Sequence, residues 1–94
     1  MENNFTMNIP KNFVVDEVAT FRIKINKLIE EGQKNFVFNF SQCDFIDSTG
    51  LGALVSVYKK CAEKGGIITL KSLKPEVEKL FKLTRLDKVF EICP

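Results

Sequence analysis

The pattern of apolar and polar residues along the chain predicts strands that alternate with helices. Residues Phe5 to Ile9 alternate between apolar and polar, which is typical of a strand with one buried face, and Pro10 ends it. Asn35 to Phe40 is dominated by aromatic and β-branched residues and predicts a buried strand. The apolar run from Ile67 to Leu70 predicts a third strand, and Val89 to Ile92 predicts an edge strand.

Three helices are predicted from apolar residues spaced three and four positions apart. The first helix, which Gly32 stops, has the stripe Val14, Val18, Phe21, Ile25 and Leu28. The second runs from about Ser48 to Lys64 and has the stripe Leu51, Leu54, Val55, Tyr58 and Cys61. The third begins at Pro75, which suits a first helical turn, and has the stripe Val77, Leu80 and Phe81.

This order of elements predicts an α/β fold with a largely parallel central sheet of about four strands and right-handed crossovers. The 94 residues are enough for one core, so we expect a single domain over residues 1–94. In such sheets the functional crevice lies beyond the carboxyl ends of the strands. Asp47 and Ser48 follow a predicted strand at that end.

The segment from Cys43 to Gly52 joins that strand to the second helix and holds two acids, two hydroxyls and two glycines. The first N–H groups of a helix lack intrahelical partners and carry a partial positive charge. A Ser or Thr oxygen can accept from them, and the same donors can hold a phosphate carried by Ser48. Gly50 and Gly52 remove side chains near that hydroxyl. The structural alternative is an ordinary capped helix after a turn.

Residues 45–52, Phe-Ile-Asp-Ser-Thr-Gly-Leu-Gly, closely resemble the signature of STAS domains. The chain resembles most the stand-alone bacterial anti-sigma factor antagonists. The resemblance runs from about Phe36 to Ile92 and includes a second stretch from Leu73 to Phe90. It departs from the family in residues 11–16, which lack the Gly-Glu-Leu-Asp-like turn before the first helix, and at Arg85, where Gly is usual.

The resemblance implies that Ser48 is a phosphoacceptor and that Asp47 positions or polarises its hydroxyl. Thr49 would be a neighbouring hydroxyl, and Gly50 and Gly52 would permit close approach. The implied partner is an anti-sigma factor that is also a serine kinase with a histidine-kinase-like ATPase fold. The unphosphorylated chain would capture this kinase and release sigma factor, phosphorylation would break the complex, and a serine phosphatase would reset it.

Ala53 and Val57 lie off the main apolar stripe of the second helix, near its Ser48 end. We expect them to form the apolar part of the surface that docks the partner. The alternative is that they cover the edges of the sheet.

The charge pattern argues against two classes of partner. The net charge of +2 comes from 14 basic and 12 acidic residues without a basic cluster, which does not favour a nucleic-acid surface. No apolar run reaches the roughly 20 residues that cross a bilayer, and the N-terminus lacks a signal-peptide pattern. We therefore expect no nucleic acid, no membrane and a cytoplasmic location.

The reactive residues do not predict an enzyme. Cys43, Cys61 and Cys93 are odd in number and widely spaced, and the chain has no His. A disulfide framework, a zinc site and a Ser-His or Cys-His pair are therefore not expected. No cofactor is predicted, and the chain is expected to be a substrate and a switch.

Three alternative functions remain open from the sequence. A ligand- or nucleotide-binding module would use the same helix start, although no Walker-type Gly-Lys-Ser/Thr sequence is present. An enzyme with Ser48 as nucleophile lacks a visible base, and Asp44 with Asp47 has no further catalytic candidate. A STAS scaffold in a signalling assembly would need no phosphorylation.

Overall fold

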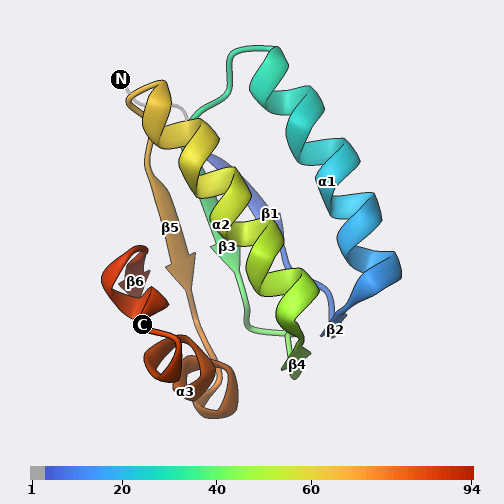
Figure 1. Cartoon of the computed structure of the whole chain (residues 1–94), viewed down its shortest axis with the longest axis vertical. Helices are drawn as coiled ribbons and strands as arrows, with labels where there is room; N and C mark the ends of the chain where they lie inside the picture. Colours follow the sequence, from blue (N-terminus) through green and yellow to red (C-terminus); the bar gives the residue numbers. More distant parts are fainter. Residues whose placement is uncertain (1–3) are drawn as a thin grey trace.

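The structure, a computed structural model, describes residues 4–94 as a parallel sheet with two helices side by side on one face (Figure 1). The elements in chain order are β1 (Phe5–Asn8), β2 (Asn12–Phe13), α1 (Val15–Glu30), β3 (Phe36–Asn39), β4 (Phe45–Ile46), α2 (Ser48–Glu63), β5 (Ile68–Lys71), α3 (Pro75–Leu83), the 3-10 turn η1 (Leu86–Lys88) and β6 (Glu91–Cys93). No helix within residues 4–94 is long and apolar enough to cross a bilayer.

The main sheet has the strand order β1-β3-β5-β6, and every neighbouring pair is parallel. Phe5 lies opposite Phe36, which in turn lies opposite Ile68. The predicted α/β fold with a four-stranded parallel sheet is therefore confirmed. The last strand begins at Glu91, two residues later than predicted, because η1 occupies the residues just before Val89.

The core lies between the sheet and the pair α1 and α2. Phe36 and Phe38 of β3 face the helices and are buried, whereas the residues between and after them are half-buried on the other face of the sheet. The Phe21 ring of α1 meets the rings of Phe13 and Phe38 edge-on, with centroids 5.0 and 5.4 Å apart. The predicted first helix is confirmed, and Gly32 follows it with a φ of +103°, which suits glycine.

The second helix is confirmed as an element, but its buried face differs from the predicted stripe. The residues of α2 that are buried are Gly50, Ala53, Leu54, Val57 and Cys61. Leu51 and Tyr58 are half-buried at the margin of the core. Leu54 and Cys61 of the predicted stripe are buried, and Gly50, Ala53 and Val57 join them in place of Leu51, Val55 and Tyr58, because the small Gly50 and Ala53 let the helix approach its neighbours closely.

The prediction that Ala53 and Val57 form a docking surface is therefore wrong. Their side chains are 0% and 2% exposed, so no partner can reach them without unfolding the helix. Any apolar docking surface near Ser48 must come from other residues.

Two local features were not predicted. Asn12–Phe13 pairs in parallel with Phe45–Ile46, which makes a second, two-stranded sheet, and α2 begins directly after it. Arg85 adopts a left-handed φ of +61° after α3. That conformation explains the glycine usual in the family, because glycine has no Cβ to strain there.

The burial of Val57 generates the first prediction. Val57→Asp should abolish the cooperative thermal transition, because an unpaired buried carboxylate costs several kcal/mol against a total stability of about 5–15 kcal/mol. Circular dichroism melting measures this, and Val55→Asp on the half-buried side of the same helix is the control, expected to keep its transition. A folded Val57→Asp protein would show that the inner face of α2 is wrongly placed.

Candidate functional site

Ser48 is the first residue of α2, and it lies at the carboxyl end of the sheet, where the sequence placed it. The N-cap is Asp47, which does the capping expected of a Ser or Thr hydroxyl. Gly50 N–H donates to Asp47 Oδ1 at 3.0 Å, and Leu51 N–H donates to the Asp47 carbonyl at 3.0 Å. Because Asp47 caps the helix, the hydroxyls of Ser48 and Thr49 are not used for this purpose.

The Ser48 side chain is exposed, and within residues 4–94 its hydroxyl has no hydrogen-bond partner. The backbone N–H groups of Ser48 and Thr49 are likewise unpaired within that range. These donors sit at the positive end of the helix dipole, so they favour an anion beside the hydroxyl. The geometry thus combines an accessible nucleophilic oxygen with groups that stabilise a phosphate on it.

The two glycines of the motif have different roles. A Cβ at Gly50 would lie 2.7 Å from the Phe13 carbonyl oxygen and 2.8 Å from Ile46 Cγ1, so Gly50 is needed for packing within the chain. A Cβ at Gly52 would meet nothing within 4 Å. Gly52 is exposed and leaves open space beside the first turn of α2, as close approach by a partner requires.

An ion-pair cluster fastens the segment that precedes Ser48. Asp44 accepts a hydrogen bond from Lys74 Nζ at the start of α3, and its other oxygen lies 3.9 Å from Lys11 Nζ. The N–H groups of Asp44 and Phe45 donate to the Lys11 carbonyl at 2.8 and 3.2 Å. This cluster could not be predicted from local patterns, because Lys74 is 30 residues from Asp44 in the chain.

The Lys74 hydrogen bond lowers the pKa of Asp44 below its ordinary value of 3.8. Because the pKa is lower in the folded state, the Asp44 carboxylate stabilises the fold at every pH above its pKa in the unfolded chain. This stabilisation is lost as the pH falls through the pKa of the folded state. At neutral pH the Asp44 carboxyl is therefore ionised.

Phe45 is a functional candidate that the sequence reasoning missed. Its ring is 55% exposed three residues before Ser48, whereas the next residue, Ile46, is buried. The strand Phe45–Ile46 has only two residues, too few for an alternation of exposed and buried positions to be recognised in the sequence. Cys43 nearby is buried, and burial raises the pKa of its thiol, so a reactive thiolate is not favoured there.

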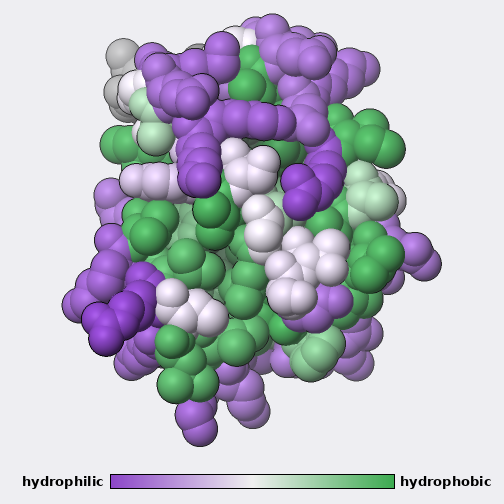
Figure 2. Space-filling model, viewed as in Figure 1, coloured by the Kyte–Doolittle hydropathy of each residue, from purple (hydrophilic) through white to green (hydrophobic). Residues whose placement is uncertain are grey.

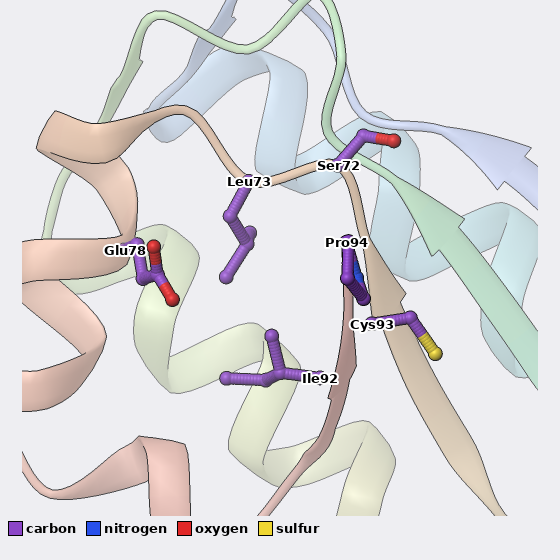
Figure 3. A pocket seen from close by; sticks show the side chains of 6 residues that line it. All are labelled: Ser72, Leu73, Glu78, Ile92, Cys93 and Pro94. Atoms are coloured by element: carbon purple, nitrogen blue, oxygen red, sulfur yellow. The ribbon is translucent and has the colours of Figure 1, made fainter.

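A hollow of about 390 Å³ lies between β6 and the connection from β5 to α3 (Figure 3). Leu73 and Ile92 project into it from opposite sides, and Glu78 lies at one margin. None of the predicted site residues lines it, and Glu78 lies 3.9 Å from the Lys82 ammonium. The hollow supplies no arrangement of groups for acid–base or nucleophilic chemistry, so the candidate site remains the start of α2.

The unequal roles of the glycines generate the second prediction. Gly50→Ala should lower the free energy of unfolding by about 1–3 kcal/mol, because its methyl group overpacks the site. Gly52→Ala should leave it unchanged or raise it by up to about 1 kcal/mol, because alanine favours helix. Urea denaturation of the two matched variants measures the difference, and equal effects would contradict the close contact at Gly50.

Comparison with known proteins identifies the family. A family model described as the STAS domain matches residues 2–94. The anti-sigma-B factor antagonist of Bacillus subtilis (strain 168) is 30% identical over 91 residues, which cover 97% of this chain and 83% of that protein. The anti-sigma factor antagonist SpoIIAA in its unphosphorylated form has a TM-score of 0.80 at 20% identity, over 97% of this chain and 79% of that one. The phosphorylated form of the Bacillus cell fate determinant SpoIIAA gives 0.79 at 21% identity, over 97% and 83%. The chain therefore belongs to the STAS domain family.

Proposed function

We propose that this chain is an anti-sigma factor antagonist that switches partners through phosphorylation of Ser48. The relative of similar length carries that name, and the fold matches an antagonist solved in both phosphorylation states. The observation that carries the proposal is the exposed Ser48 hydroxyl without a hydrogen bond within residues 4–94, beside two unpaired N–H groups. The unphosphorylated chain binds an anti-sigma factor and thereby releases sigma factor.

In this proposal the anti-sigma factor is itself a serine kinase with a histidine-kinase-like ATPase fold. Ser48 Oγ attacks the γ-phosphorus of ATP held by the kinase, ADP leaves, and the hydroxyl proton passes to a base. Asp47 is half-buried, and its Oδ2 has no hydrogen bond within residues 4–94, so it can orient the hydroxyl while Oδ1 caps the helix. A serine phosphatase removes the phosphate, and the chain acts as substrate and switch in the cytoplasm.

The size of the electrostatic effects places the switch at the interface with the partner. A phosphate at a helix N-terminus gains about 0.3–1 kcal/mol, up to about 2 in favourable settings. Near-complete inversion of a two-state population needs about 5.5 kcal/mol. Nearly two negative charges beside Asp47 inside an interface cost several kcal/mol through repulsion and desolvation. Phosphorylation should therefore block docking while hardly changing the fold.

The apolar part of the docking surface is assigned to Phe45 and the half-buried Leu51, which flank Ser48 along the chain. They replace Ala53 and Val57, which are buried. Figure 2 shows apolar side chains over the middle and lower middle of the face that carries the helices, bordered by hydrophilic ones at the upper end, the lower left and the bottom margin. Aromatic residues, Phe among them, are enriched at protein interfaces.

The proposed switch predicts opposite behaviour of two Ser48 variants. Ser48→Ala used as bait in cytoplasm of the source organism should retain an ATPase-fold kinase, and Ser48→Asp should lose it, as mass spectrometry of the bound proteins would show. Ser41→Asp, which adds the same charge at an exposed position after β3, is the control and should retain the kinase. If Ser48→Ala and Ser48→Asp retain the same partners, the chain is instead a constitutive STAS scaffold.

The docking surface generates a separate prediction. Phe45→Ala should weaken binding of the captured anti-sigma factor by about thirtyfold or more, as expected for a hot-spot aromatic residue. Ile67→Ala is the matched control, because Ile67 is 53% exposed but precedes β5, at the opposite end of the sheet. Titration calorimetry of both variants makes the comparison, and equal affinities would remove Phe45 from the interface.

A further inference from the structure

The outer edge of β1 has no paired strand within residues 4–94. In the main sheet β1 is a terminal strand and pairs only with β3 within residues 4–94. Phe5 N–H donates to the Asn35 carbonyl and Ile9 N–H to the Asn39 carbonyl, both at 2.9 Å, so the odd-numbered residues bond inward. The backbone groups of Thr6 and Asn8 therefore point outward, and no residue among 4–94 pairs with them.

A largely apolar hollow of about 280 Å³ lies beside this edge. Met7 and Pro10 line it from the strand side, and Thr20 and Phe21 line it from α1. Figure 1 shows α1 lying out beyond β1, on the face of the sheet that carries the helices. A further strand would lie about 4.7–4.9 Å beyond β1, and α1 would cover one face of it. A side chain of that strand on the face toward α1 would enter the hollow.

Two charged side chains of α1, Glu17 and Lys24, lie at opposite ends of this hollow, which together with the β1 edge forms a groove. Lys24 lies 5.8 Å above the Phe5 ring, at the amino end of β1, and Glu17 lines the hollow two turns earlier on α1. Neither side chain has an ion pair within residues 4–94. Seven residues of helix span about 10 Å, which an extended chain covers in about three to four residues.

We propose that the β1 edge binds an extended segment of a partner protein as an antiparallel fifth strand. Antiparallel pairing is slightly more stable per residue than parallel pairing, and the addition of a strand to a sheet edge is an established mode of peptide recognition. The segment carries a large apolar residue for the hollow, a basic residue two positions before it for Glu17, and an acidic residue two positions after it for Lys24. The intervening residues point to the open face of the sheet.

A second copy of this chain is a poorer occupant of the edge. Two β1 strands paired antiparallel about a two-fold axis would keep both α1 helices on the same face. Because α1 already extends beyond β1, the two helices would compete for the same space. A separate extended segment brings no such helix with it.

The test is an NMR titration of the ¹⁵N-labelled chain with the synthetic peptide acetyl-Lys-Thr-Leu-Thr-Glu-amide, up to about 2 mM. Saturable amide shifts confined to β1 and the facing side of α1 are expected. Thr6→Pro removes one outward N–H without touching a β1–β3 hydrogen bond and should abolish the shifts, whereas Thr6→Val keeps the N–H and should preserve them. Lys24→Glu should raise the dissociation constant about two- to tenfold.

Three results would overturn the proposal. These are the absence of shifts at β1, equal binding by Thr6→Pro and Thr6→Val, and concentration-dependent β1 shifts without peptide. The last would assign the edge to a second copy. The test is independent of Ser48, because Ser48→Asp should bind the peptide as the unmodified chain does.

Discussion

The close contact between Gly50 and the β2–β4 pair is the constraint on which the functional end of the molecule depends. The main sheet stops before Ser48, and the start of α2 is held by the short second sheet, through the Phe13 backbone and the Ile46 side chain. A glycine in the first turn costs helix stability relative to alanine. It is retained because a Cβ at that position would push the helix away from both strands, and Ser48 with it.

The capping arrangement follows from that placement. Once the helix start is fixed against β4, one carboxylate oxygen of Asp47 satisfies the Gly50 N–H, and the serine hydroxyl has no structural task. A side chain that serves as a cap cannot also be modified without loss of the cap. Because Asp47 and not Ser48 caps the helix, the proposed phosphate on Ser48 could be added and removed while the helix keeps its N-terminal hydrogen bonds.

Much of the fold could be predicted because its longer elements carry strong local signals. The strand around Phe38, the helix from Val15 to Glu30 and the stop at Gly32 are all visible in apolar spacing and in glycine positions. The phase of α2 could not be predicted, because that helix has two candidate faces. The predicted stripe was right at Leu54 and Cys61, but Gly50 and Ala53, which allow close approach, complete the buried face on its other side. The spacing of apolar residues shows where a helix is hydrophobic, but it does not show how closely that helix approaches its neighbours.

The parts of the site that escaped prediction depend on contacts between distant segments. Lys74 meets Asp44 across 30 residues, and the Lys11 carbonyl accepts two backbone N–H groups from the segment that leads to Ser48. Lys11 also directly follows Pro10, which lines the hollow beside β1, so the proposed strand-binding edge and the segment that leads to Ser48 share one connection. Each of those backbone hydrogen bonds contributes about 0.5–1.5 kcal/mol. Together the two therefore stabilise the segment that leads to Ser48 by about 1–3 kcal/mol, a contribution that no local sequence pattern reveals.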